Sequence, residues 1–87
     1  MRITLYCPKT VESHIQTLLP PSYTVVQGLG YYQGVGEEIA IYTIGVDTLY
    51  QVQTIVSPII QALLEAGEEC VYYEVDTHTV GYTVSAP

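Results

Sequence analysis

The stretch QGLGYYQGVGEE, residues 27–38, joins two runs of residues that favour β-strands. Residues 23–29 and residues 37–44 are rich in Tyr, Thr, Val and Ile, whose aromatic or branched side chains fit a pleated surface. Two such runs around a short glycine-rich segment are typical of a β-hairpin. We expect the glycines to occupy bulges or positions with positive φ.

The same glycines also allow a ligand-binding loop. A phosphate-binding loop is followed directly by a helix, whose amide ends meet the phosphate. Here a strand pattern follows instead, and Glu37 and Glu38 would repel a phosphate. The pattern therefore favours a hairpin in which Tyr31 and Tyr32 flank a bend. A loop that binds a protein or a small ligand is the alternative.

Strand and helix patterns alternate on either side of the hairpin. Residues 2–7 alternate apolar and polar side chains, as a strand with one buried face does. Residues 10–19 carry an apolar stripe at helical spacing, with Thr10 as the cap and two prolines at the end. Residues 69–75 and 80–84 read as two further strands, the last of them short and at an edge.

A second helix pattern begins after a cap at Asp47 or Thr48 and ends at Gly67. Pro58 interrupts this pattern, because proline removes one backbone hydrogen bond and crowds the preceding turn. Two arrangements fit the sequence. The helix kinks at Pro58, or Ser57 caps a fresh helix that has Pro58 at its first position.

The 87 residues therefore predict one α+β domain, residues 1–87, with the order βαββαβ and an extra C-terminal edge strand. This is the order of the ferredoxin-like sandwich, in which two helices cover one face of an antiparallel sheet. We expect the open face of the sheet to carry Thr4, Tyr6, Tyr42 and Tyr73. An open face rich in tyrosine is typical of an oligomer or partner surface.

The charge balance is strongly acidic, with a net charge of −7 and only Arg2 and Lys9 as bases. Neutralising phosphates requires a row of bases, so nucleic acids and anionic membranes are not expected as partners. The acidic surface suits a basic protein, a cation or simple solubility. The sequence shows neither a signal-peptide pattern nor an apolar stretch long enough to cross a membrane, so we expect a cytoplasmic protein.

Residues that could carry chemistry are few. Cys7 and Cys70 lie inside strand patterns and are expected to be buried thiols, while His14 and His78 lack the short paired spacings of a zinc site. Cys7 with His14 remains open as a nucleophile and base, but no positive charge nearby lowers the pKa of the thiol. The sequence predicts no catalytic residue, no metal and no cofactor, and hence no enzyme.

Two resemblances follow from these motifs. GLGYYQGVGEE, an IAIY strand, a helix and AGEECVYYEV resemble a small uncharacterised family of bacterial and phage proteins, over roughly the last two thirds of the chain. That family has a G-x-G-Y-[WY]-x-G-x-x-E hairpin and, after a helix, a [NG]-[QE]-E-x-V strand. The matching positions here are Gly28, Gly30, Tyr31, Tyr32, Gly34, Glu37, Gly67, Glu68, Glu69 and Val71.

The predicted architecture is also similar to the ferredoxin-like trimers of the PII and CutA type. Those proteins bind nucleotides or metals in clefts between subunits and use a long loop between two strands. This chain lacks the basic residues of such nucleotide sites, and its hairpin is shorter. The resemblance therefore implies a trimer more strongly than it implies a ligand.

Two functions fit these features of the sequence. The first is a non-enzymatic acidic protein, encoded by a phage and acting in the host cytoplasm. It would inhibit a basic partner that handles nucleic acids or serves host defence. The second is a homo-oligomer of the PII and CutA type that binds a small molecule or metal at its subunit junctions. The predicted binding residues are Tyr31, Tyr32, Gly34, Glu37, Glu38 and Tyr73.

Overall fold

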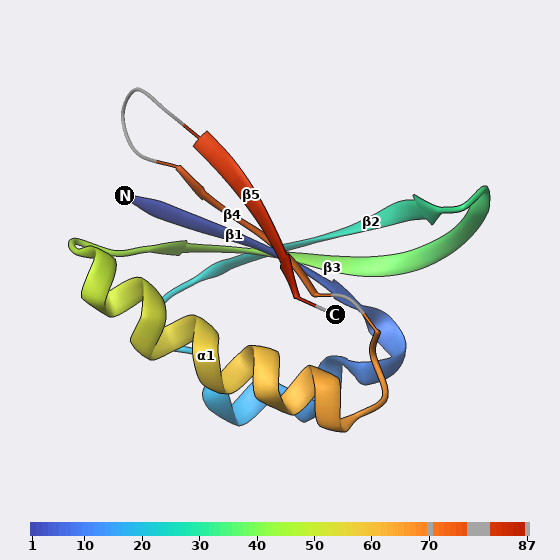
Figure 1. The fold of residues 1–87 in the computed structure, drawn as a ribbon, viewed down its shortest axis with the longest axis horizontal. Helices are drawn as coiled ribbons and strands as arrows, with labels where there is room; N and C mark the ends of the chain where they lie inside the picture. The colour runs from blue at the N-terminus through green and yellow to red at the C-terminus, as the bar shows by residue number, and fades with distance from the viewer. Residues whose placement is uncertain (70, 77–80, 87) are drawn as a thin grey trace.

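The computed structural model describes residues 1–69, 71–76 and 81–86, which form one antiparallel sheet with helices on one face (Figure 1). Within these residues the sheet has five strands in the order β2-β3-β1-β4-β5. The strands are β1 (Arg2–Pro8), β2 (Thr24–Tyr32), β3 (Val35–Gly45), β4 (Val71–Asp76) and β5 (Gly81–Ala86). The helical elements are the 3-10 helices η1 (Lys9–His14) and η2 (Gln16–Leu18) and the α-helix α1 (Leu49–Glu65).

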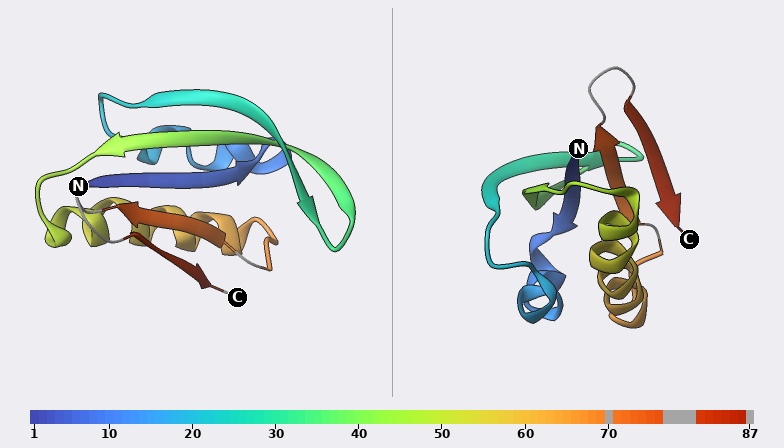
Figure 2. Two further views of the ribbon diagram at one scale, coloured as in Figure 1. Left: turned by 90° about the horizontal axis from the view of Figure 1, so that it is seen from above. Right: turned by 90° about the vertical axis from the view of Figure 1, so that its left-hand side faces the viewer.

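The helical elements lie together on one side of the sheet, with η1 and η2 beside α1 (Figure 2). The alternation in β1 follows from this cover, because Ile3, Leu5 and Cys7 are buried beneath the helices. From α1, Ile59 and Leu63 pack into the same core. The predicted α+β class is confirmed, and β5 is an edge strand. No helix in the described part of the chain is long and apolar enough to cross a membrane.

The β2–β3 hairpin is confirmed, with a register that runs without a bulge from Thr24 opposite Thr43 to Tyr32 opposite Val35. Its turn consists of Gln33 and Gly34, with φ of 50° and 81°. Two consecutive residues with positive φ match the twist of a two-residue hairpin. The glycines therefore serve no bulge.

Glycines within the hairpin strands make room for side chains instead. A Cβ on Gly30 would lie 3.3 Å from Cδ1 of Ile39, and a Cβ on Gly36 would lie 3.1 Å from Cε1 of Tyr31. These are tight approaches, so the glycines let Ile39 and Tyr31 lie flat across the partner strand.

The first predicted helix is wrong, because residues 9–18 form two 3-10 segments. Pro8, not Thr10, is the N-cap of η1, and no side chain caps it. Two residues seven positions apart, such as Val11 and Leu18, point within about 20° of the same direction in an α-helix. In a 3-10 helix they point about 120° apart. Leu18, seven residues after buried Val11, is accordingly exposed, while Ile15, which lies between the two 3-10 segments, is also buried. Among the residues that the structure describes, one α-helix therefore covers the sheet, not two.

Helix α1 begins and ends as the sequence predicts. The hydroxyl of Thr48 accepts from the Gln51 amide and the Gln51 side chain accepts from the Thr48 amide, which is a capping box. Gly67, with φ of 100°, follows the last turn. Its amide donates to the Leu64 carbonyl, and the Glu68 amide donates to the Leu63 carbonyl. This is a Schellman motif, the usual glycine end of a helix.

Pro58 lies inside α1, which runs without a break from Leu49 to Glu65. The alternative in which Ser57 starts a fresh helix is therefore wrong. Pro58 and Thr54 are both exposed. The Thr54 carbonyl, which loses its partner at Pro58, can therefore bond water.

Two of the four residues predicted on the open face lie on the covered face. Tyr42 of β3 and Tyr73 of β4 both stand opposite Leu5 in the register, so they share its face and pack in the core. Val71 and Val75 are buried on the same face as Tyr73, which is itself partly buried against the core. Thr4 and Tyr6 alternate with the buried residues of β1 and lie on the open face, as predicted.

Candidate functional site

A groove of about 740 Å³ lies where the β2–β3 hairpin extends beyond the ends of β1 and β4. This volume falls within the range of about 300–1,000 Å³ typical of small-molecule sites. The lining is dominated by tyrosines and glutamates, and none of the described lining residues is a Lys, Arg or His. Those that matter here are Tyr6, Tyr31, Tyr32, Tyr72, Glu37, Glu68, Glu69 and Glu74.

The floor of the groove comes from the open face of the sheet. Tyr6 of β1 stands opposite Tyr72 of β4 in the register. The Tyr6 hydroxyl donates to Oε1 of Glu74 at 3.1 Å, which fixes both side chains. Burial, and then the hydrogen bond to Glu74, raise the pKa of Tyr6, so its hydroxyl keeps its proton.

One wall comes from the segment that follows α1. The Schellman motif at Gly67 turns the chain so that Glu68 is half-buried while Glu69 is exposed. The pKa of Glu68 is raised, first by burial and then by the nearby charges of Glu37 and Glu69. A carboxylate crowded by like charges is stabilised when a cation binds beside it. This wall therefore favours a positively charged ligand.

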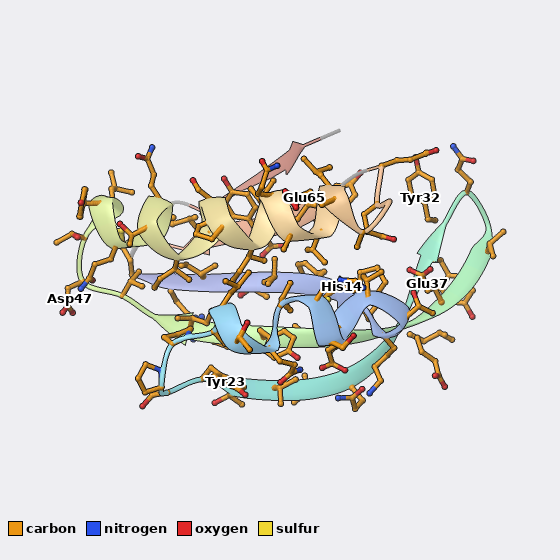
Figure 3. The ribbon with its side chains drawn as sticks, turned by 90° about the horizontal axis from the view of Figure 1, so that it is seen from below. His14, Tyr23, Tyr32, Glu37, Asp47 and Glu65 are labelled. Atoms are coloured by element: carbon orange, nitrogen blue, oxygen red, sulfur yellow. The ribbon has the colours of Figure 1, made fainter. Side chains whose placement is uncertain are left out.

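The opposite wall is the hairpin tip, where Tyr32 and Glu37 lie near one another (Figure 3). Tyr31 is 72% exposed and Tyr32 is 55% exposed, although aromatic side chains are usually more buried. Exposed rings of this kind are available to stack on a flat ligand. Gly30 adds no side chain to the lining and so keeps the space between the walls open.

The structure brings half of the predicted binding residues to this groove. Tyr31, Tyr32 and Glu37 line it. The other three, Gly34, Glu38 and Tyr73, are not among its lining residues. Gly34 forms the turn, Glu38 is exposed on the opposite face of β3 from Glu37, and Tyr73 packs against the core.

Five of the tyrosines and glutamates that line the groove were missing from the predicted site. Tyr72 and Glu74 alternate with buried Val71 and Val75, so the period of two in β4 could have placed them beside Tyr6 on the open face. Glu68 and Glu69 carry no comparable signal, because their position depends on the turn after α1. The missing residues are Tyr6, Glu68, Glu69, Tyr72 and Glu74.

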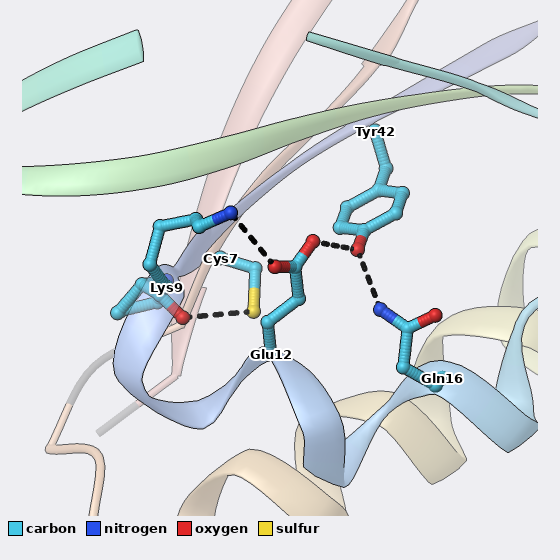
Figure 4. Close-up of polar contacts among 6 residues, drawn as sticks. Cys7, Lys9, Glu12, Gln16 and Tyr42 are labelled. Carbon is cyan, nitrogen blue, oxygen red and sulfur yellow. Dashed lines mark hydrogen bonds and ion pairs between the residues drawn. The ribbon is translucent and has the colours of Figure 1, made fainter. Parts of the chain in front are cut away.

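A second polar cluster lies on the covered face, beneath η1 (Figure 4). The Tyr42 hydroxyl donates to Oε2 of Glu12 and accepts from Nε2 of Gln16 at 3.1 Å. Nζ of Lys9 lies 3.4 Å from Oε1 of Glu12. Burial, and then the hydrogen bond to Glu12, raise the pKa of Tyr42. Every member of this cluster has a partner, so it stabilises the fold and offers no open site.

Cys7 is fully buried beside this cluster, and its thiol contacts the Pro8 carbonyl at 3.5 Å. Burial, followed by the charges of Glu12 and Glu68, raises the pKa of the thiol to about 12. A thiol in this state is not a nucleophile near neutral pH, and His14 is exposed to solvent. The prediction that Cys7 is a buried thiol is confirmed, and the Cys7–His14 pair is excluded as a catalytic couple. Cys70 and His78 lie outside the described residues.

The described part of the chain holds no group of three or more His, Cys, Asp or Glu side chains arranged to bind a metal ion. The groove carboxylates therefore act as separate charges around a cavity.

The sequence matches no protein-family model and no curated protein. Its structure is similar to that of a phage SAM lyase in the apo state, with a TM-score of 0.70 and 14% identity over 98% of this chain and 88% of that chain. It is also similar to a phage SAM lyase in complex with S-methyl-5'-thioadenosine, with a TM-score of 0.65 and 13% identity over the same shares. At this level of identity the likeness establishes the fold alone.

These matches overturn the predicted function. The prediction was a non-enzymatic inhibitor of a basic partner, with a junction-binding oligomer of the PII and CutA type as the alternative. The similar structures are instead those of a phage SAM lyase, which is an enzyme. The acidic composition suggested a docking surface, but glutamates gather in a groove large enough for a small molecule. The expectation that the chain is no enzyme is corrected on the same finding.

Proposed function

We propose that this protein binds S-adenosylmethionine (SAM) in the groove and cleaves it, releasing S-methyl-5'-thioadenosine. The observation that carries this proposal is a groove of tyrosines and glutamates, without a described base in its lining. The fold, which is similar to that of a SAM lyase, supports it.

SAM combines a flat adenine ring with two positive charges, at the sulfonium and at the α-ammonium. Tyrosine rings stack on such a base and attract cations to their faces. The carboxylates of Glu37, Glu68 and Glu69 complement the positive charges. A ligand rich in phosphate would meet like charge on the same walls, so nucleotides are poor candidates.

A lyase breaks a carbon–sulfur bond of SAM without adding water. The bonding electron pair goes to sulfur, which leaves as the neutral thioether of S-methyl-5'-thioadenosine. The remaining four-carbon fragment closes onto its own carboxylate as a lactone, or it loses a proton to a base as an alkene. In the second route Glu68, with its raised pKa, accepts the proton. In both routes the groove holds and orients the substrate.

The fold supports a finer assignment, a reduced ferredoxin-like sandwich. The antiparallel order β4-β1-β3-β2 is that of the split βαβ arrangement. In this view η1 and η2 occupy the place of the first helix, and β5 is an addition at one edge. The resemblance to small bacterial and phage proteins, and the cytoplasmic location, stay predictions within this proposal.

We further propose that the chain self-associates through β2. This strand is an edge of the sheet, and its open backbone groups can pair with another strand. Val26, Leu29 and Val35 of the hairpin are each more than half exposed. A second copy would cover them. Size-exclusion chromatography with light scattering tests this, and a monomer at micromolar concentration would contradict it.

The direct test of the function is incubation of the purified chain with SAM, followed by chromatography and mass spectrometry of the products. We expect S-methyl-5'-thioadenosine to accumulate in proportion to protein concentration. Tyr32→Ala and Glu68→Gln should lower the rate at least about tenfold, which corresponds to about 1.4 kcal/mol of transition-state stabilisation.

Glu38→Gln is the matched control for these variants. It removes the same charge from the other face of β3, outside the groove, and should leave the rate unchanged. SAM that stays intact beside folded protein would contradict the proposed function.

A further inference from the structure

We infer that the groove selects its ligand by the positive charge at the position of sulfur, so that it binds the sulfonium form of an adenosyl ligand and releases the neutral thioether. This inference rests on the proposed function, since it concerns how the same site distinguishes substrate from product.

The walls of the groove carry charge of one sign. Glu37 comes from β3, Glu68 and Glu69 come from the segment after α1, and Glu74 comes from β4. Burial first, and then the charges of Glu37 on the hairpin and of neighbouring Glu69, raise the pKa of Glu68, as expected for carboxylates gathered around one groove. A cation between these walls relieves their mutual repulsion, but a neutral sulfur does not.

The aromatic part of the site contributes little to this discrimination. Adenine is identical in substrate and product, so stacking on Tyr31 or Tyr32 stabilises both. The sulfonium gains an additional attraction to the tyrosine faces, which a thioether lacks. Affinity for the adenosyl group therefore depends on the tyrosines, whereas selection by charge depends mainly on the carboxylates.

Cleavage of the carbon–sulfur bond removes the charge on which this selection depends. The electron pair moves to sulfur, and S-methyl-5'-thioadenosine remains in the groove as a neutral molecule. Its contacts with the carboxylates then resemble those of any neutral group. The groove therefore loses affinity for the product at the step that forms it, and product inhibition should be weak.

The test compares two ligands that the chain cannot cleave at sulfur. Sinefungin carries an ammonium-bearing carbon in place of the sulfonium, and S-adenosylhomocysteine carries a neutral thioether there. Calorimetric titration of the full chain should give at least about tenfold tighter binding of sinefungin at low salt. Because the preference is electrostatic and the groove is open to solvent, it should shrink in 0.5 M NaCl.

Variants separate charge from shape. Glu68→Gln and Glu37→Gln keep the side-chain volume and should each reduce the preference for sinefungin at least about threefold, with little change for S-adenosylhomocysteine. Glu38→Gln lies outside the groove and should keep the full preference. Circular dichroism of each variant confirms that the fold is retained.

The outcomes distinguish the two claims. Equal binding of both ligands would overturn selection by charge and leave the proposed function standing. A preference that persists in both glutamine variants would also overturn it. Failure of both ligands to bind folded protein would overturn the proposed function and this inference together.

Discussion

Two tyrosine–glutamate pairs lie on opposite faces of the sheet, and they differ in what surrounds them. On the covered face, Tyr42 donates to Glu12, which also pairs with Lys9, while Gln16 donates to the tyrosine. On the open face, Tyr6 donates to Glu74 at the floor of the groove. The same pairing is part of a closed network in one place and of a cavity wall in the other.

The difference shows how one residue type serves two purposes in this chain. Tyr42 is 1% exposed, and each polar group around it has a partner, so its hydroxyl contributes to folding. Tyr6 and Glu74 line a space in which acids outnumber bases, so their polar groups remain available to a ligand. Variants on the two faces should therefore affect different measurements.

The largest effect is expected for the rate at which the Cys7 thiol, buried on the covered face, reacts with a reagent. In a Cys70→Ser chain, Cys7 should react with a thiol reagent at pH 8 at least about 100-fold more slowly in folded than in urea-unfolded protein. Burial and a pKa raised to about 12 keep the thiol protonated and out of reach. Absorbance of the released reagent group measures the rate.

A control thiol sharpens this prediction. A cysteine placed at exposed Glu38, with both natural cysteines replaced, should react at nearly the same rate with and without urea. Rapid labelling of Cys7 in the folded chain would contradict the covered packing.

Tyr42→Phe is expected to lower the free energy of unfolding by about 1–3 kcal/mol, because it leaves Glu12 and Gln16 without a buried partner. Urea unfolding followed by circular dichroism measures the change. Unaltered stability would show that the network on the covered face contributes nothing to the fold.

Tyr6→Phe is expected to change the free energy of unfolding by less than about 1 kcal/mol, since solvent can replace the hydroxyl at Glu74. The variant should instead alter ligand affinity in the groove. If Tyr6→Phe destabilises the chain as much as Tyr42→Phe does, the two faces do not differ as described.

The smallest effect is expected from the protonation of Glu68. Its pKa in the folded chain is raised above the ordinary 4.5, so the folded state binds this proton more tightly than the unfolded state. The stabilisation from the bound proton is complete below pH 4.5 and is lost as pH rises through the folded pKa. Glu68→Gln should therefore be more stable than the natural chain near pH 7.

The measurement for Glu68 is the difference in unfolding free energy between the two chains across the range from pH 7 to pH 4.5. The advantage of Glu68→Gln should diminish as the pH falls. An advantage that grows on acidification would show that the folded-state pKa is lowered rather than raised.

Much of the fold follows from local patterns in the sequence. The alternation in residues 2–7, the glycine turn at Gly34 and the capping box at Thr48 each have a local physical cause, and each appears in the structure. The first helix could not be predicted correctly. Its apolar spacing fits an α-helix, but the structure forms 3-10 turns between Pro8 and the two prolines at 20 and 21.

The site was less predictable because it depends on register and on distant segments. The sequence alone does not say which face of β3 is covered, so Tyr42 was assigned to the wrong face. Tyr73 lies two residues from both Val71 and Val75, so the alternation of β4 did indicate that it shares their covered face. The nearness of Glu68 to Glu37 depends on where the hairpin tip lies relative to α1, which no local pattern encodes.

The decisive experiment on the groove is a titration of isotope-labelled protein with sinefungin, followed by two-dimensional amide NMR. Amide signals of residues 30–37 of the hairpin, of Tyr6 and of residues 68–74 should shift. The signals of Glu12, Gln16 and Tyr42 should show no comparable shift. Shifts centred on the covered cluster, or none at all at saturating ligand, would contradict the claim that the open groove is the functional site.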